Sequence, residues 1–293
     1  MKNNKLIGTG VALVTPFDEQ GKIDFAALER LVQHTTQGGV DYLVVLGTTA
    51  ETPTLSQDEK QEILERVKQY NTAHLPIVAG IGGNNTADVV EKIQHTNFDG
   101  IDALLSVTPY YNKPSQQGLY EHFATIGKAS PVPVVLYNVP SRTGANLLPE
   151  TVLRLANEPN IVAIKEASGI IAQVAAILRD KPADFIVLSG DDGLAVPFMS
   201  LGAQGLISVA ANAVPAVIVG MVKAALHGDY PAAAKIQLQM QPFIDACFAE
   251  GNPVGVKAAL SILGIAKNTL RLPLVPASAT LMQRMNLLME SMQ

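Results

Sequence analysis

Short apolar runs recur along most of the chain and alternate with longer amphipathic segments. The segments between the runs show helical periodicity, for example in residues 58–70, 86–95 and 148–156, and Asp24, Ser56 and Thr86 are in place to cap helices. Brief runs rich in β-branched side chains are typical of strands buried on both faces. The runs occupy residues 11–14, 42–46, 77–79, 103–107, 134–137, 161–164, 185–188 and 205–208.

This alternation of strands and helices predicts a parallel sheet covered by helices. Eight such units within about 230 residues match the size of a closed (β/α)8 TIM barrel. A doubly wound open sheet is the alternative, but the sequence lacks the glycine-rich turn that would follow its first strand. We therefore expect the α/β class, with a TIM barrel formed by residues 1–229.

Residues 230–293 contain no further strand pattern and predict a C-terminal helical appendix of about three helices. Breaks between these helices are expected at residues 251–253 and 272–276, which contain glycine or proline. The methionines between residues 282 and 292 are expected to serve packing, because methionine fills irregular gaps between helices.

The composition narrows the class of protein. Of the 293 residues, 48% are hydrophobic and 16% charged, and the net charge is −5, so the chain has no basic footprint for nucleic acid. Cys247 is the only cysteine, which excludes an internal disulfide and a cysteine-rich metal site. We find no signal-peptide pattern and no apolar run near the roughly 20 residues of a membrane span. The sequence predicts a cytoplasmic protein that binds no membrane.

Candidate chemistry gathers at the carboxyl ends of the predicted strands, where TIM barrels carry their active sites. Lys165 directly follows the apolar run 161–164, so its stem is expected to lie in apolar surroundings with its amine at the mouth of the barrel. Burial disfavours the charged ammonium and favours the neutral amine, which attacks a ketone to form a Schiff base. The alternative is a lysine that extends to the rim of the sheet and into water.

Other strand ends offer hydroxyl groups and one cation. Tyr137 ends the strand before that of Lys165, and because neighbouring strands lie about 4.8 Å apart, its phenol can approach the amine and move protons. Thr48 and Thr49 can hold a small carboxylate, or can simply cap a helix. Arg142, in the loop after Tyr137, suits bidentate capture of a carboxylate, although most such arginines are surface residues.

The strand ends contain no histidine, and we therefore expect no metal. A metal-dependent aldolase would need imidazole or carboxylate ligands converging at the mouth. Asp191 and Asp192 follow the seventh strand, near the usual phosphate site of this fold, and would repel phosphate. A substrate without phosphate is expected.

Several longer motifs follow one another along the chain. They are Gly-Thr-Thr-Ala-Glu at 47–51, Thr-Pro-Tyr-Tyr-Asn at 108–112, Tyr-Asn-Val-Pro-Ser-Arg at 137–142, Lys-Glu-Ala-Ser-Gly at 165–169, Ser-Gly-Asp-Asp at 189–192 and Leu-Arg-Leu-Pro-Leu at 270–274. In this order they resemble the motifs of the dihydrodipicolinate synthase (4-hydroxy-tetrahydrodipicolinate synthase) family, within the N-acetylneuraminate lyase superfamily of class I, Schiff-base aldolases. The similarity extends over nearly the whole chain.

The resemblance implies condensation of pyruvate with L-aspartate 4-semialdehyde, the first committed step of the diaminopimelate pathway to lysine, by a homotetramer built as a dimer of dimers. It implies no metal and no organic cofactor. The implied roles are an imine-forming Lys165, a proton relay of Tyr137, Thr48 and Tyr111, the last reaching in from a neighbouring subunit, and substrate contacts from Thr49, Arg142, Gly190 and Ile207.

Two alternatives stay open at this point. Other pyruvate-dependent aldolases and lyases of 2-keto-3-deoxy acids share Lys165 and Tyr137. Arg142 and Tyr111 are therefore the residues that distinguish the condensation from the reactions of those enzymes. The other alternative is a catalytically silent barrel that only binds ligands. The presence of all these residues together argues against it.

Family members that lysine inhibits often carry histidines and a glutamate where this chain has Gln57, Lys60 and Asp88. Asn84 and Tyr110 do match the pattern of those members. Feedback inhibition by lysine is therefore not expected to be strong.

Overall fold

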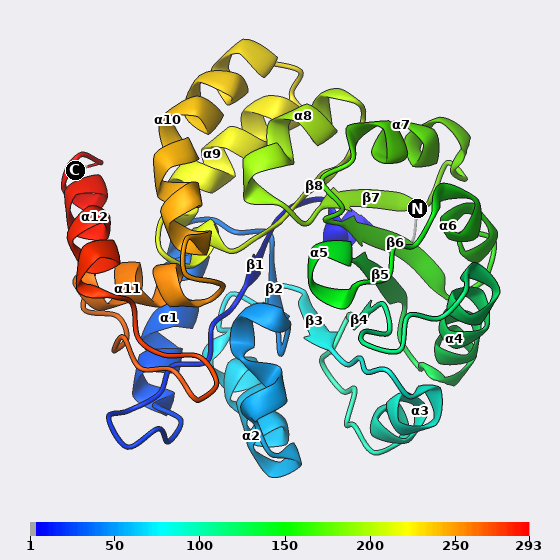
Figure 1. The fold of residues 1–293 in the computed structure, drawn as a ribbon, viewed down its shortest axis with the longest axis horizontal. Coiled ribbons are helices and arrows are strands. Elements are labelled where there is room, and N and C mark those ends of the chain that lie inside the picture. Colours follow the sequence, from blue (N-terminus) through cyan, green and yellow to red (C-terminus); the bar gives the residue numbers. More distant parts are fainter. Residues whose placement is uncertain (1–3, 293) are drawn as a thin grey trace.

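The computed structural model describes residues 4–292 and shows a closed barrel of eight parallel strands. Each strand pairs with the next along the chain, and β8 closes the barrel against β1 (Figure 1). The predicted TIM barrel is confirmed. The strands are β1 (Gly8–Ala12), β2 (Tyr42–Val45), β3 (Ile77–Gly80), β4 (Ala103–Val107), β5 (Val134–Asn138), β6 (Ile161–Glu166), β7 (Ile186–Ser189) and β8 (Gly205–Ser208).

Helices surround the barrel and connect its strands (Figure 1). Single-turn 3-10 helices are η1 (Asn4–Leu6), η2 (Thr48–Ala50), η3 (Thr52–Thr54), η4 (Asp192–Leu194) and η5 (Ala210–Asn212). The α-helices are α1 (Phe25–Gln37), α2 (Gln57–Tyr70), α3 (Thr86–Gln94), α4 (Gln116–Ala129), α5 (Pro140–Thr143), α6 (Pro149–Leu155), α7 (Ile171–Asp180), α8 (Ala195–Ser200), α9 (Pro215–Leu226), α10 (Tyr230–Phe248), α11 (Val254–Ile262) and α12 (Ala279–Glu290).

The helix starts follow from side-chain caps. The Asp24 side chain accepts a hydrogen bond from a first-turn amide of α1, and Ser56 forms a reciprocal capping box with Glu59 in α2. The expectation for Thr86 was wrong. Asn85 caps α3 with its side-chain oxygen, while the Thr86 hydroxyl lies 2.8 Å from Nδ1 of a histidine in α4.

The first strand begins earlier than its apolar run, because two glycines belong to it. A Cβ added at Gly10 would lie 2.1 Å from the ring of Tyr42, which is completely buried in the barrel. The aromatic ring therefore occupies the volume that a side chain at position 10 would need. Glycine has low strand propensity, which is why the pattern of apolar residues placed this strand at 11–14 instead.

Two apolar layers build the core, one inside the barrel and one between the strands and the helices. Because side chains alternate along a strand, Val135 and Tyr137 share the interior face of β5, and Ala163 and Lys165 share that of β6. Glu166 consequently lies on the other face of β6. The period of two thus points Lys165 toward the barrel axis, at the end of an apolar column.

The C-terminal region forms α10, α11 and α12, with breaks at the expected positions. In Figure 1 these helices lie at one side of the barrel, with α10 packed against α9 and α8 and α12 beside α11. The prediction of three helices is confirmed. The division into a unit of residues 1–229 and a unit of residues 230–293 stays a prediction.

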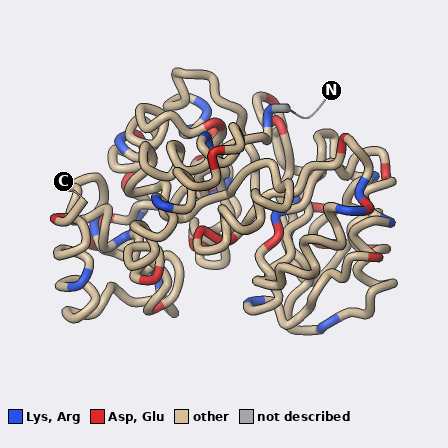
Figure 2. Tube along the Cα trace, turned by 90° about the horizontal axis from the view of Figure 1, so that it is seen from above, with Lys and Arg blue, Asp and Glu red and all other residues tan. Residues whose placement is uncertain are grey.

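Basic and acidic residues are interspersed along the chain trace (Figure 2). Within residues 4–292, no helix combines the length and the apolar character needed to cross a bilayer.

Candidate active site

Lys165 lies near the end of β6 and is buried, with 5% of its surface exposed. Its side chain follows the interior apolar column of the barrel and extends toward the carboxyl ends of the strands. A lysine is seldom buried to this degree without a partner or a chemical role. The expected placement of the amine at the mouth of the barrel is confirmed.

Tyr137 on β5 is the direct neighbour of Lys165 across the sheet, because the two residues are paired in the strand register. The Nζ atom of Lys165 lies 4.2 Å from the centre of the Tyr137 ring. The phenol is 6% exposed and shares the same cavity. The expected approach of phenol and amine is therefore present in the fold.

Gly190, just after β7, makes room for the lysine. A Cβ at this position would lie 2.9 Å from both Cγ and Cε of Lys165. A larger residue would displace the amine from its place beside Tyr137. The Gly190 amide also donates to the carbonyl oxygen of Glu166 at 2.8 Å, which fixes the loop against β6.

A cavity of about 560 Å³ opens above these strand ends. It brings together five of the residues expected from the sequence: Thr49, Tyr137, Arg142, Lys165 and Gly190. Its volume suits small organic molecules, and the cationic side chains of its lining, Lys165 and Arg142, suit organic acids among them. The other lining residues are Val139, Ser141, Ala167, Asp191, Gly193, Leu194, Val209, Gln241, Ile244, Asp245, Phe248, Ala249 and Asn252.

Comparison with known proteins identifies the family. Residues 5–291 match the sequence model of the Dihydrodipicolinate synthetase family. The 4-hydroxy-tetrahydrodipicolinate synthase of Parabacteroides distasonis is 52% identical over 277 residues, which cover 94% of this chain and 93% of that protein.

The chain belongs to the dihydrodipicolinate synthetase family. The crystal structure of dihydrodipicolinate synthase from Thermotoga maritima superimposes with a TM-score of 0.95 at 37% identity, covering 98% of this chain and 99% of that one. The chloride-inhibited dihydrodipicolinate synthase of Acinetobacter baumannii, solved in complex with pyruvate, gives a TM-score of 0.94 at 37% identity and covers 97% and 98%. The chain is thus an enzyme of a lyase family.

The threonine pair of this family member lies in η2, directly after β2. Thr49 is buried and its hydroxyl accepts a hydrogen bond from Asn252 Nδ2 at 3.0 Å. Thr48, one residue earlier, is half-buried and lies outside the lining of the cavity. Only Thr49 is in place to contact a ligand in the cavity directly.

Arg142 and Tyr111 extend from loops at the rim. Arg142 belongs to the short helix α5, is exposed and lines the cavity. Tyr111 is 88% exposed, has a φ of 74°, and does not line the cavity of its own subunit. Its backbone amide donates to the carbonyl oxygen of Thr143 at 3.3 Å, so the loop that carries Tyr111 is tied to the end of α5.

Ile207 lies on β8 and is buried in the apolar interior of the barrel. It does not line the cavity. Its side chain contributes to the apolar layer, and its expected role as a substrate contact through the backbone stays a prediction.

Carboxylates behind the cavity are held by hydrogen bonds. Asp192 is completely buried, binds the Ser208 hydroxyl and accepts from the Val209 amide at 2.8 Å, and its burial raises its pKa to about 6. Burial also raises the pKa of Asp191, which lines the cavity. Both groups are therefore weaker acids than ordinary aspartates.

Glu166, whose role the sequence did not reveal, serves the scaffold. Its carboxylate is buried and accepts hydrogen bonds from the Ser168 amide at 2.6 Å, from Asn138 Nδ2 at 3.1 Å and from Gln173 Nε2 at 3.2 Å. Burial raises its pKa. These contacts join the ends of β5 and β6 on the face opposite Lys165 and so stabilise the strand pair that carries Tyr137 and Lys165.

Three polar residues of the C-terminal helices also face the cavity: Gln241, Asp245 and Asn252. Sequence reasoning missed them and treated Asn252 only as part of a helix break. No local pattern marks them, because they reach the barrel mouth through the packing of α10 and α11.

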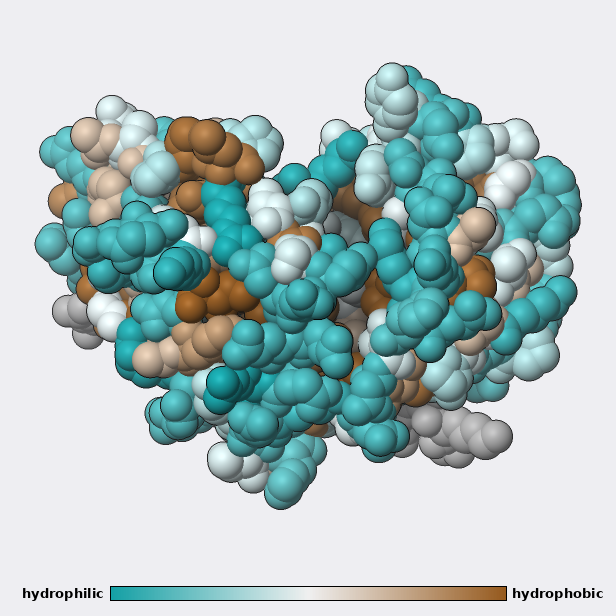
Figure 3. Space-filling model, turned by 90° about the horizontal axis from the view of Figure 1, so that it is seen from below, coloured by the Kyte–Doolittle hydropathy of each residue, from teal (hydrophilic) through white to brown (hydrophobic). Residues whose placement is uncertain are grey.

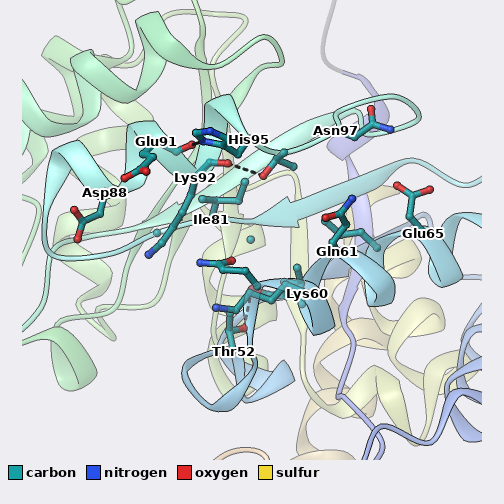
Figure 4. A pocket seen from close by; sticks show the side chains of 16 residues that line it. Thr52, Lys60, Gln61, Glu65, Ile81, Asp88, Glu91, Lys92, His95 and Asn97 are labelled. Atoms are coloured by element: carbon teal, nitrogen blue, oxygen red, sulfur yellow. Dashed lines mark hydrogen bonds between the residues drawn. The ribbon is translucent and has the colours of Figure 1, made fainter.

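A second cavity, of about 440 Å³, lies between α2 and α3 beside the end of β3. Gln57, Lys60 and Asp88 line it, together with Lys92 and Glu91 of α3 (Figure 4). Figure 3 views the molecule from below, toward the side that carries α2 and α3, and shows this face hollowed near its middle. The three residues that depart from the lysine-inhibited pattern of the family are therefore gathered around one cavity.

Proposed function

We propose that this chain condenses pyruvate with L-aspartate 4-semialdehyde to give 4-hydroxy-tetrahydrodipicolinate through an imine on Lys165. The observation that carries the proposal is the buried amine of Lys165, 4.2 Å from the ring of Tyr137 in a cavity that Arg142 also lines. Family membership supports the same reaction, which is the first committed step of lysine synthesis through diaminopimelate.

The geometry supports the following steps. The neutral amine of Lys165 attacks the ketone carbon of pyruvate, and loss of water gives the imine. In this proposal the Tyr137 phenol donates protons to the departing hydroxyl and accepts them again. Loss of a methyl proton gives an enamine, whose carbon attacks the aldehyde of the second substrate. The amino group of aspartate semialdehyde then attacks the imine carbon and expels the Lys165 amine, which closes the ring of the product and regenerates the enzyme. The water lost in imine formation is the only water released.

The substrate carboxylates are assigned to two places in the cavity. Thr49, with its hydroxyl already oriented by Asn252, contacts the pyruvate carboxylate near Lys165, and Gly190 contributes backbone contacts. Arg142 at the rim binds the carboxylate of aspartate semialdehyde. Thr48 links Tyr137 to Tyr111 in the proton relay. This arrangement uses no metal and no organic cofactor.

Reduction with borohydride in the presence of pyruvate tests the mechanism. Peptide mass mapping should find reduced pyruvate attached to Lys165 and to no other lysine. Lys257 is the matched internal control, since it is also buried but lies outside the cavity. An adduct elsewhere, or no adduct, would contradict the proposed chemistry. Activity with pyruvate and other aldehydes separates this reaction from that of a 2-keto-3-deoxy acid lyase.

We also propose a homotetramer formed from two dimers, with Tyr111 completing the site of the neighbouring subunit. Tyr111 is almost fully exposed in the single chain, which suits a residue that contacts a partner. A second set of exposed apolar side chains follows the neighbouring helices α7, α8 and α10, and offers a further interface. These side chains are Ile170, Ile171, Leu201 and Leu238.

Complementation between two inactive variants tests the shared site. Tyr111→Phe and Lys165→Met are each expected to be nearly inactive, because each removes one group from every site. A mixed dimer contains one site with both native groups, so refolding the two variants together should restore activity. If the mixture stays as inactive as its components, Tyr111 does not act across subunits. Location of the enzyme in the cytoplasm stays a prediction.

A further inference from the structure

The turn after β2 contains a residue in an unusual backbone conformation. Glu51 directly follows the η2 turn that carries Thr48 and Thr49, and it has φ 54° and ψ 35°. This left-handed region is sparsely populated by residues other than glycine. Such a conformation persists only where the surrounding structure holds it, and it is often found beside functional groups.

The contacts that hold Glu51 come from the C-terminal region. Its side chain is completely buried and forms an ion pair with Lys257 of α11, at 2.5 Å between Oε1 and Nζ. The other carboxylate oxygen accepts the backbone N–H of Arg271 at 3.0 Å. A buried carboxylate keeps its charge only with such partners, so these two contacts determine where the residue can lie.

Both partners are themselves fixed. Lys257 Nζ also donates to the carbonyl oxygen of Thr269 at 2.9 Å and lies 4.2 Å from the ring centre of Phe17. The Arg271 guanidinium packs on the same ring at 4.5 Å and donates to both carboxylate oxygens of Glu59, at 2.6 and 2.8 Å. The ion pair therefore belongs to a rigid network that joins α11 to α2 and to the segment after β1.

The same turn has a second connection to the C-terminal region. Asn252, two residues before the start of α11 at Val254, donates a hydrogen bond to the hydroxyl of Thr49. On the other side, the Thr15 hydroxyl donates to the carbonyl oxygen of Ala50 at 2.8 Å. The threonine pair is thus held between the barrel and the C-terminal helices.

We infer that Glu51 and Lys257 are positioning residues for the pyruvate-binding end of the site. Their buried ion pair holds the left-handed turn, and the turn sets the direction of the Thr48 and Thr49 hydroxyl groups. The C-terminal helices are then part of the machinery that recognises pyruvate, although neither Glu51 nor Lys257 lines the cavity. This inference rests on the proposed function, in which the threonines handle pyruvate.

The decisive comparison separates positioning from simple stabilisation of the fold. Glu51→Gln is nearly isosteric and keeps an acceptor for the Arg271 amide, but removes the charge that fixes Lys257. The KM for pyruvate is expected to rise by about tenfold or more. The KM for aspartate semialdehyde should change by less than about twofold, because Arg142 lies on another loop.

A double variant, Glu51→Gln with Lys257→Met, removes both buried charges together. Replacing a buried ion pair by uncharged groups of similar volume is often neutral for stability, whereas removing one partner alone is strongly destabilising. The double variant should therefore melt near the temperature of the native enzyme and still show the raised KM for pyruvate. If Glu51→Gln alone does not fold, the KM of the double variant for pyruvate still tests the inference.

Lys267→Met is the matched control. Lys267 also joins the C-terminal region to the barrel through an ion pair, with Glu19 at 2.7 Å, but this pair is exposed and remote from the threonine turn. Both KM values should stay unchanged in this variant.

Three results are distinguishable. If the KM for pyruvate returns to the native value in the double variant together with the melting temperature, or if it never rises, the pair is only structural and the inference is overturned. A raised pyruvate KM at native stability supports it. Failure of the native enzyme to form any imine with pyruvate would instead overturn the proposed function.

Discussion

The two cavities at the carboxyl ends of the strands differ in how their charged groups are held. In the first, Lys165 is 5% exposed and its amine projects from a strand inside the barrel. In the second, Lys60 and Lys92 project from the surface helices α2 and α3 and are half-buried (Figure 4). A group fixed by a sheet can be desolvated and oriented for chemistry, whereas half-buried groups on helix surfaces keep part of their hydration.

The buried titratable groups behind the two cavities also respond to acid in opposite directions. Burial raises the pKa of Asp192, behind the first cavity, to about 6. Burial lowers the pKa of His122 to about 4, and this histidine contacts the first residue of α3, which forms one wall of the second cavity. The fold therefore favours protonation of Asp192 behind the first cavity and disfavours protonation of His122 beside the second.

The largest expected effect is that of Lys165→Met, which removes the amine without changing the volume greatly. We expect kcat to fall by at least about 10⁴-fold, since no other group in the cavity can form the covalent intermediate. Steady-state assays and borohydride trapping measure this loss. A matched substitution in the second cavity, Lys92→Met, should leave kcat unchanged. Activity retained by Lys165→Met would remove the distinction between the two cavities.

Arg142→Ala should separate the two halves of the reaction. Loss of a charge-assisted carboxylate contact costs about 2–5 kcal/mol when water is excluded, so kcat/KM for aspartate semialdehyde should fall by about 10²-fold or more. Imine formation with pyruvate should persist, because Arg142 lies at the rim. Lys113→Ala in a neighbouring loop is the control. An unchanged dependence of the rate on aspartate semialdehyde would refute the role of Arg142.

Acid should destabilise the folded protein through protonation of His122, which contacts α3 at the wall of the second cavity. The pKa of His122 is about 4 in the folded protein and 6.5 for an ordinary histidine, so the unfolded chain binds the proton first as the pH falls. The contribution of His122 to the free energy of unfolding is complete above pH 6.5. It decreases by about 2 kcal/mol by pH 5 and by about 3 kcal/mol below pH 4. For Asp192 the effect of acid on stability has the opposite sign, because its pKa is raised in the folded state, which therefore binds the proton first.

A comparison of urea unfolding at pH 7 and pH 5 isolates the histidine. His122→Gln keeps a polar partner for Thr86 and has no titrating group, so its stability should decrease less with acid than that of the native protein. Equal pH dependence of the two proteins would show that His122 does not contribute.

The smallest expected effect concerns inhibition by free lysine. Lys60 lines the second cavity, and burial lowers its pKa, with a further contribution from the neighbouring positive charge of Lys92. Like charges about 4 Å apart repel by ~4 kcal/mol at an effective dielectric of 20. A solvent-screened part of that repulsion weakens the binding of a cationic ligand by about tenfold. We therefore expect weak or no inhibition at physiological concentrations of lysine.

Initial rates measured against lysine concentration test this expectation. Half-inhibition in the submillimolar range would contradict the prediction. Lys60→Gln should strengthen any inhibition, whereas Lys128→Gln on α4, outside the cavity, should leave it unchanged.

The alternation of apolar runs and helical segments was sufficient to predict the barrel and the three C-terminal helices, because strand burial and helix periodicity are local properties of the sequence. The place of Lys165 followed as well, since a residue near the carboxyl end of a buried strand lies close to the mouth of a parallel barrel. The apolar pattern misplaced the start of β1, because the strand contains glycines. The reason for a glycine at position 10, the ring of Tyr42, lies on the next strand. Thr86 was misassigned because its hydroxyl contacts α4 instead of its own helix.

The sequence by itself therefore determined the architecture and the principal chemical group, because both depend on residues that are neighbours along a strand or a helix. Only the tertiary structure decided which side chains share a cavity. It placed Asn252 against Thr49 and Lys257 against Glu51, pairs separated by 203 and 206 positions in the chain. Such contacts arise where α11 packs back onto the barrel, and no local pattern encodes the geometry of that packing.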